Sequence, residues 1–283
     1  MRNKNYLSIY AKSFNWAGFF LPKKTYLNCS SLYDFCRTID NIADDNDVLE
    51  NKKKNLLNFR NNFNNRDFSD SVIKNMWYLI DKFEISTKIV NDLIDGAESD
   101  LKEKVTINSQ KELLIYSYRV AGTVGLMMAK ILNVKNRDAL KSAIDLGIAM
   151  QLTNISRDIV EDASNNRFYI TSDFNSIRET LKLADQFYKS SFSSINKIPI
   201  SFRFAILVAR RVYREIGYNI LKKKNIENYK RSGKIYVNNM SKVLQTLLSI
   251  YDFINLLLIK SNEHSRDKEH LIINEEINLN DRF

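Results

Sequence analysis

The segment QLTNISRDIVED, residues 151–162, carries the clearest structural signal in the chain. Its apolar residues recur at three- and four-residue spacing, which is the period of an α-helix. Residues four apart share a helix face, so Asn154, Asp158 and Asp162 form one stripe. Extended backwards, the same stripe contains Gln151, Gly147 and Ala143. The stripe therefore changes from small residues through amides to carboxylates, as expected along a deep pocket with an apolar floor and a charged mouth.

A second acidic segment, YDFCRTIDNIADD at residues 33–45, repeats this spacing. Asp40 and Asp44 share one helix face, and Tyr33 and Arg37 lie on the same broad stripe. Carboxylates four residues apart repel each other, so a pair in apolar surroundings needs a compensating cation. Oxygen ligands without His or Cys favour a hard ion, and Mg²⁺ is the usual one when phosphate oxygens share its coordination sphere.

Either acidic pair alone is also compatible with an exposed helix face, because the spacing is common. Two features favour a functional site. Both pairs lie in segments that are too apolar to be fully exposed. Each pair is also accompanied by an arginine, Arg37 or Arg157, where a bound diphosphate would need cations.

The rest of the sequence predicts a single all-α domain at residues 1–261 and a polar C-terminal tail at 262–283. Only 7 Gly and 2 Pro occur, which leaves room for long uninterrupted helices. We expect Ser69 and Ser109 to act as helix N-caps. The periodicity predicts helices at 3–18, 24–45, 48–64, 69–83, 86–104, 109–133, 136–163, 173–195, 200–225 and 234–261.

Composition narrows the classes of function. The net charge of +10 favours phosphorylated substrates or anionic surfaces, and without a nucleic-acid-binding motif we expect no nucleic-acid partner. His264 and His270 are the only histidines and lie in the polar C-terminal stretch, so we expect no histidine in the core. Cys29 and Cys36 are expected to pack as small hydrophobes, which fits a cytoplasmic protein. No segment has the length of a membrane span, so any contact with the inner membrane is expected to be peripheral.

The two acidic segments resemble the squalene/phytoene synthase family, the head-to-head type of trans-isoprenyl diphosphate synthase. The likeness rests on CRTIDNIADD at 36–45 and on QLTNISRDIVEDASNNRFYI at 151–170, of which the second is highly specific. It extends to Phe14, FLPK at 20–23, YRVAGTVG at 118–125 and VYREIG at 212–217. It therefore covers most of the chain, and the bacterial phytoene synthases are the most similar members.

The resemblance implies an isoprenoid synthase helical bundle with a central cavity. Asp40, Asp44, Asp158 and Asp162 would be the catalytic carboxylates, and with Asn154 they would hold Mg²⁺, or alternatively Mn²⁺. The residues expected to bind diphosphate are Tyr33, Arg37, Arg157, Tyr213 and Lys234, the last of which stands near a position where the family often has Arg. The residues expected to line the cavity are Phe14, Gly18, Tyr116, Val120, Val124, Ala143, Gly147 and Gln151.

Helical spacing agrees with part of this assignment. Tyr116, Val120 and Val124 are four apart and share one face, and Gly122 and Gly125 would let their helix approach a neighbour or a ligand closely. Ordinary helix packing would give the same pattern.

The implied reaction is the head-to-head condensation of two geranylgeranyl diphosphates to 15-cis-phytoene through a cyclopropylcarbinyl diphosphate, in carotenoid biosynthesis. Ala17 and Gly18, one helical turn beyond Phe14, leave room for a longer chain and favour C20 over C15 donors. The alternatives are a squalene- or dehydrosqualene-type synthase that uses farnesyl diphosphate, or a non-catalytic homologue that acts in assembly. The sequence leaves the oligomeric state open.

Overall fold

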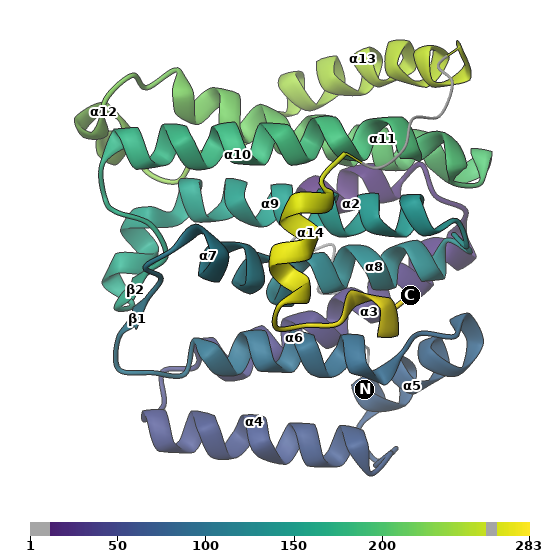
Figure 1. Cartoon of the computed structure of the whole chain (residues 1–283), viewed down its shortest axis with the longest axis vertical. Coiled ribbons are helices and arrows are strands. Elements are labelled where there is room, and N and C mark those ends of the chain that lie inside the picture. Colours follow the sequence, from purple (N-terminus) through teal and green to yellow (C-terminus); the bar gives the residue numbers. More distant parts are fainter. Residues whose placement is uncertain (1–11, 259–264) are drawn as a thin grey trace.

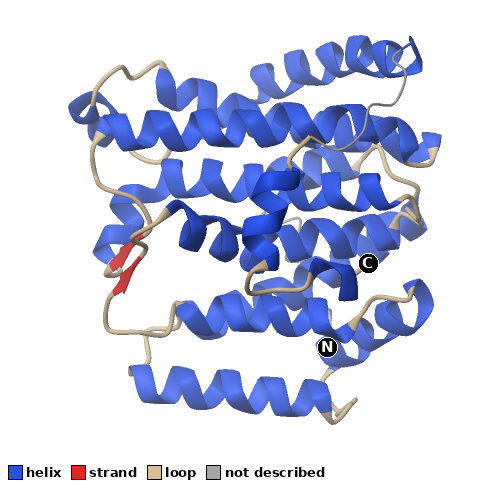
Figure 2. Cartoon of the chain, viewed as in Figure 1, coloured by secondary structure: helices blue, strands red, loops and turns tan. Residues whose placement is uncertain are grey.

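The computed structural model describes residues 12–258 and 265–283, and within these ranges the chain is almost entirely helical (Figure 1). Figure 2 shows that, besides loops and turns, the described residues contain one parallel pair of two-residue strands, β1 (Val105–Thr106) and β2 (Arg167–Phe168). The helices are α2 (Lys12–Gly18), α3 (Lys23–Asp44), α4 (Leu49–Asn64), α5 (Ser71–Phe83), α6 (Thr87–Ser99), α7 (Gln110–Ser117), η1 (Tyr118–Gly122), α8 (Thr123–Ile131), α9 (Arg137–Ser164), α10 (Phe174–Ser193), η2 (Ser194–Lys197), α11 (Ile200–Leu221), α12 (Ile226–Arg231), α13 (Asn239–Leu258), α14 (Asp267–Asn274) and η3 (Leu279–Asp281). The prediction of an all-α fold is confirmed.

Helix α9, which contains the more specific acidic segment, lies in the middle of the bundle (Figure 1). It packs against α8, α10 and α11. Its N-terminus is capped by Asn136, whose side-chain oxygen accepts a hydrogen bond from the backbone N–H of Ala139 (3.1 Å). Buried residues occur on several faces of the helix, as expected for a helix surrounded by others.

The contact between α8 and α9 is unusually close because glycines lie on both helices. A Cβ atom on Gly125 would lie 2.2 Å from the carbonyl oxygen of Ala143, and one on Gly147 would lie 2.2 Å from that of Ala121. No other residue fits at either position without moving a backbone. The expectation that this glycine-containing helix approaches a neighbour closely is confirmed.

The helix predicted at 109–133 contains a π-helical turn. The backbone N–H of Thr123 bonds to the carbonyl of Tyr118, five residues earlier, within η1. A π turn contains one residue more than an α-helical turn. The helical residues before it are therefore rotated by about 100° about the helix axis relative to the residues after it. Residues before and after η1 therefore do not share the stripe that regular spacing predicts.

Helix boundaries agree with the sequence in most places. Ser109 caps α7 as predicted and accepts a hydrogen bond from the N–H of Glu112 (3.1 Å). The prediction that Ser69 is an N-cap was wrong. The next residue, Asp70, caps α5, and its side chain accepts a hydrogen bond from the backbone N–H of Val72 (2.7 Å).

The last long helix begins later than predicted. It starts at Asn239 rather than 234, because the short helix α12 ends near Gly233, whose φ of 62° is left-handed. Residues 232–238 between α12 and α13 form no regular structure. The helix predicted at 3–18 is described only from Lys12, and His264 lies outside the described residues.

The described part of the expected C-terminal tail is folded onto the bundle. Helix α14 packs against α7, and Ile273, Ile277 and Leu279 are buried. His270 is also buried, with its Nε2 atom 2.7 Å from the carboxylate of Asp145 on α9. The expectation that the core contains no histidine was therefore wrong. No helix in the described part of the chain has both the length and the hydropathy needed to cross a bilayer.

Candidate active site

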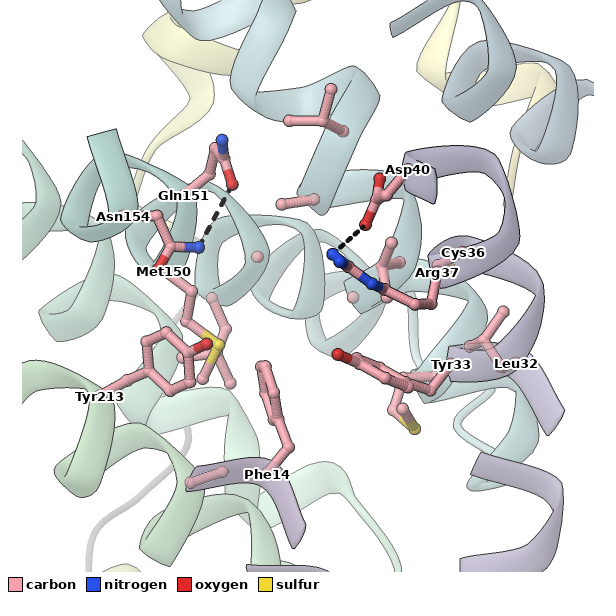
Figure 3. A pocket seen from close by; sticks show the side chains of 18 of the residues that line it. Phe14, Leu32, Tyr33, Cys36, Arg37, Asp40, Met150, Gln151, Asn154 and Tyr213 are labelled. Carbon is pink, nitrogen blue, oxygen red and sulfur yellow. Dashed lines mark hydrogen bonds and ion pairs between the residues drawn. The ribbon is translucent and has the colours of Figure 1, made fainter. Parts of the chain in front are cut away.

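A cavity of about 1440 Å³ lies between α2, α3, α8, α9 and α11. Figure 3 shows that Phe14, Tyr33, Arg37, Asp40, Gln151, Asn154 and Tyr213 converge on it from four of these helices. The sequence-predicted residues that line the cavity are Phe14, Gly18, Tyr33, Arg37, Asp40, Asp44, Val120, Val124, Ala143, Gly147, Gln151, Asn154, Arg157, Asp158, Asp162, Tyr213 and Lys234. The two acidic rows therefore face one space.

The first acidic row comes from the C-terminal half of α3. Arg37 lies 4.0 Å from the carboxylate of Asp40, and Arg167, from β2, donates a hydrogen bond to Asp44 (2.9 Å). Asp40 faces the cavity, and 54% of its side chain is exposed. Desolvation within the cavity raises the pKa of Asp40 from 3.8 to about 7, against the opposing effect of Arg37.

The second acidic row comes from the C-terminal end of α9. Arg157 donates to both carboxylate oxygens of Asp158, at 2.9 and 2.5 Å. Lys234 lies 3.4 Å from Asp158 and 2.5 Å from Glu161. Burial, followed by repulsion from Asp158, raises the pKa of Asp162 from 3.8 to about 7, and Arg167 opposes this rise. Negative charge at this end of the cavity thus exceeds what the local cations neutralise.

The donor atoms of these rows fit a hard cation that is delivered with a phosphate. The Oδ1 atom of Asn154 is buried and has no hydrogen-bond partner, whereas its amide nitrogen lies 3.4 Å from Gln151 Oε1 (Figure 3). Among the described residues, no three acidic, His or Cys side chains converge closely enough to hold an ion by themselves. Mg²⁺ typically takes one or two carboxylates and completes its coordination with water and substrate phosphate. One or two carboxylates from either row, with Asn154, therefore match its needs.

Aromatic side chains form the wall next to the acidic mouth. The rings of Phe14 on α2 and Tyr213 on α11 lie 4.8 Å apart and are tilted by 38°. Burial raises the pKa of Tyr213, while the nearby Arg157 guanidinium lowers it. Burial also raises the pKa of Tyr33, again against a neighbouring arginine, Arg37. Both phenols stay neutral and can donate hydrogen bonds to an anion.

Part of the apolar wall is formed by small side chains. Ala17, Gly18 and Cys29 line it, and a Cβ atom on Gly18 would lie 2.8 Å from the ring of Tyr26. Cys29 and Cys36 are buried free thiols, as predicted, and burial raises the pKa of Cys29 to about 12. This part of the wall offers apolar volume without charge.

Tyr116 was predicted to line the cavity, but it is not among the described residues that do so. Its ring stacks on Tyr169 at 4.7 Å, and its hydroxyl contacts Asp100 (2.8 Å) and the Tyr169 hydroxyl (2.9 Å). The π turn explains the difference, because it separates Tyr116 from Val120 and Val124, which do line the cavity.

Two lining residues were missed by the sequence analysis. Asp100 follows α6 directly, and burial raises its pKa, partly offset by Arg167. Arg167 stands in the basic-aromatic tail of the second motif but was given no role there. Its charge acts on Asp40, Asp100 and Asp162, so it is the cation shared by both acidic rows. The only sequence signal for a role of Arg167 in the site is its position within the second motif, five residues after Asp162.

An all-α bundle with one cavity, apolar in depth and acidic at its mouth, is the architecture of an isoprenoid synthase. The sequence profile described as Squalene/phytoene synthase matches residues 7–176, which is more than half of the chain. The protein therefore belongs to the squalene/phytoene synthase family.

Curated relatives carry names from the same family. The 15-cis-phytoene synthase of Pantoea ananas is 27% identical over 247 residues, covering 76% of this chain and 80% of the relative. The phytoene synthase of Pseudescherichia vulneris is 29% identical over 243 residues, covering 74% and 78%. The similarity to bacterial phytoene synthases that the motifs indicate is thus confirmed.

Solved structures support the fold. A dehydrosqualene synthase crystallised with a ligand superposes with a TM-score of 0.74 at 28% identity, covering 88% of this chain and 94% of that one. The squalene synthase HpnC from Alicyclobacillus acidocaldarius gives a TM-score of 0.66 at 17% identity, covering 79% and 91%, and supports the fold alone.

Proposed function

We propose that the protein is a Mg²⁺-dependent prenyltransferase that condenses two geranylgeranyl diphosphates head to head to 15-cis-phytoene. The observation that carries this proposal is the meeting of two carboxylate rows, each with its own arginine, over one large cavity with an apolar interior. Bacterial phytoene synthases among the relatives favour the same product.

At the mouth of the cavity, the carboxylate rows bind metal ions and the basic residues bind the diphosphates. Asp40, Asp44, Asn154, Asp158 and Asp162 would hold the metal ions, which supply positive charge to the diphosphate oxygens when bound. The groups that bind the diphosphates and stabilise the departing charge are Tyr33, Arg37, Arg157, Tyr213 and Lys234, together with Arg167. Preorganised charge of this kind is usually the largest catalytic contribution.

The apolar part of the cavity protects the reacting carbons. Ionisation of the first substrate gives an allylic cation, which the double bond of the second substrate attacks, and loss of a first proton closes the ring of a cyclopropylcarbinyl diphosphate. A second ionisation, rearrangement and loss of a second proton give phytoene. Val120, Val124 and Ala143 exclude water, while the ring faces of Phe14 and Tyr213 stabilise positive charge. The diphosphate released in each step can accept the proton of that step, and the buried His270 contacts Asp145 rather than lining this cavity.

The preference for C20 chains rests on the small residues in the apolar wall. A side chain on Gly18 would displace the ring of Tyr26, which also lines the cavity, so glycine at this position preserves the present shape of the wall. The similarity to a dehydrosqualene synthase structure favours a second candidate, a C15-using synthase.

One incubation separates the candidates. The purified protein is given farnesyl or geranylgeranyl diphosphate, with Mg²⁺ or with EDTA, and the hydrocarbon product is identified by mass spectrometry. Formation of phytoene from the C20 substrate, in the presence of Mg²⁺ only, is expected. A C30 product from farnesyl diphosphate alone would indicate the second candidate, and no product from either substrate would indicate a non-catalytic homologue.

A further inference from the structure

Helix α13 packs on the bundle through its polar side. Its buried residues include Lys242, Ser249 and Asp252. Arg211 of α11 donates to both carboxylate oxygens of Asp252, at 2.5 and 2.6 Å. Close to it, Gln245 donates to Glu215 (3.0 Å). Specific polar contacts therefore hold much of this helix in place, together with the buried Leu256 and the partly buried Phe253 near its C-terminal end.

The outward side of α13 is correspondingly apolar. It exposes Met240 (84%), Leu244 (54%), Leu247 (58%), Tyr251 (63%) and Ile254 (51%) along one stripe. The charged residues of the helix, Lys242 and Asp252, are both buried, so the exposed stripe carries no charge. From Met240 to Ile254 the stripe is about 21 Å long, at about 1.5 Å per helical residue. In Figure 1 the helix lies at the edge of the bundle, with α11 beneath it.

This apolar surface is continuous with the wall of the cavity. The ring of Phe253 on α13 lies 6.4 Å from that of Phe204, which in turn lies 5.0 Å from that of Phe20. Phe20 is partly exposed, its neighbour Phe19 is 73% exposed, and the next residue, Leu21, lines the cavity. A row of aromatic side chains therefore connects α13 with the segment whose Leu21 lines the cavity.

We infer that the outward face of α13, together with Phe19 and Phe20, is the surface by which the protein lies on a lipid bilayer. The polar inward face and uncharged outward face suit a helix that lies in the plane of the membrane interface. Exposed Lys23 and Lys24 stand three and four residues after Phe20, so positive charge lies near this end of the surface, where anionic headgroups would meet it. The inference rests on the proposed function only in taking the substrate to be a lipid.

A bilayer fits this face better than a second copy of the chain. The exposed stripe offers aliphatic side chains with few groups that could form the hydrogen bonds of a protein interface. Contact with a bilayer also explains why the apolar surface leads to the cavity. Self-association of the face remains a distinct and measurable outcome.

The test measures binding to vesicles without any substrate, so it is independent of the proposed reaction. Wild-type protein is incubated with vesicles of phosphatidylcholine alone, or mixed with phosphatidylglycerol, and the bound fraction is determined by sedimentation. The variant Leu247→Gln/Ile254→Gln is expected to bind at least roughly tenfold more weakly to both. The control Leu57→Gln/Leu271→Gln changes residues of similar exposure, 56% and 63%, on other helices and is expected to bind like wild type.

A second variant tests the charged part of the surface. Lys23→Gln/Lys24→Gln is expected to bind roughly tenfold more weakly to the anionic vesicles and unchanged to the neutral ones. Circular dichroism checks that each variant is folded.

Four results would overturn the inference. They are a wild-type protein that does not bind vesicles, an α13 variant that binds like wild type, a control that loses binding equally, and a wild-type dimer that the α13 variant converts to monomers in sedimentation velocity.

Discussion

The close contact of α9 with η1 makes Gly147→Ala a severe change despite its small size. The added Cβ would lie 2.2 Å from the carbonyl oxygen of Ala121 and 2.9 Å from the Cα of Gly122. Both atoms belong to the backbone, so no rotamer change can relieve the contact. Ordinary van der Waals contact begins at 3.4 Å, so the helices would have to separate locally by about 1.2 Å, the difference between these two distances.

The expected cost follows from two opposing effects. Overpacking of a well-packed core costs about 1–3 kcal/mol, and a rigid backbone contact belongs at the upper end. Replacing glycine inside a helix by alanine returns about 0.5–1 kcal/mol. We therefore expect a net loss of about 2–2.5 kcal/mol in the free energy of unfolding. This corresponds to a fall in Tm of several degrees at roughly 2–4 °C per kcal/mol. Turnover should fall as well, because Gly147 lines the cavity.

Gly217→Ala is the matched control. Gly217 also lies inside a helix, α11, but its added Cβ would meet only the end of the Leu181 side chain, at 3.2 Å. This variant should be as stable as wild type or slightly more stable. Thermal unfolding followed by circular dichroism compares the two. If Gly147→Ala unfolds at the wild-type temperature, or if Gly217→Ala is destabilised as much, the steric argument fails.

Four further predictions concern the charged groups. Asp158→Asn should lower turnover at least roughly hundredfold with an unchanged circular dichroism spectrum, and a loss of helical signal would instead indicate a structural role. The pKa of Asp162 is about 7 in the folded protein against 3.8 in the unfolded chain. Its ionisation therefore lowers the stability of the folded protein progressively as the pH rises from 3.8, and the loss is complete above pH 7. Asp162→Asn should therefore raise Tm above pH 7 while abolishing turnover, and the gain in Tm should vanish toward pH 3.8. Lys234→Gln should raise KM for the diphosphate substrate, whereas Lys234→Arg should preserve it; equal KM values would remove Lys234 from the binding site. His270→Leu leaves the carboxylate of Asp145 buried without this partner and should cost about 3–5 kcal/mol by denaturant titration, but much less in an Asp145→Asn background.

The sequence predicted the helices well because most of them bury one regular stripe of apolar residues. The acidic rows were predicted for the same reason, since Asp40, Asp44, Asp158 and Asp162 lie in uninterrupted α-helix where four-residue spacing fixes a common face. The same argument could not predict the position of Tyr116. The π turn at Tyr118–Gly122 leaves no trace in the spacing of apolar residues, yet it rotates one part of the helix relative to the other.

Long-range contacts account for the other differences. Arg167 joins the site because a parallel strand pair places it beside both acidic rows, and two residues of strand carry no periodic pattern. The segment that contains His270 looked like a free tail because its own composition is polar. Its place in the core depends on a carboxylate from α9, far away in the sequence, which no local pattern indicates.

The pairing of β1 with β2 has a mechanical consequence for how lipid diphosphates enter and leave. Val105 pairs with Arg167 and Thr106 with Phe168, so the segment that follows Asp100 is tied to the segment that follows Asp162. These two sides of the mouth are therefore joined by backbone hydrogen bonds. Lys234 belongs to residues 232–238, which form no helix or strand and are anchored by the buried side chains of Ile235 and Val237. Lys234 itself reaches the mouth only through its ion pairs with Asp158 and Glu161, so a diphosphate that takes over these contacts should displace its side chain more easily than the paired strands.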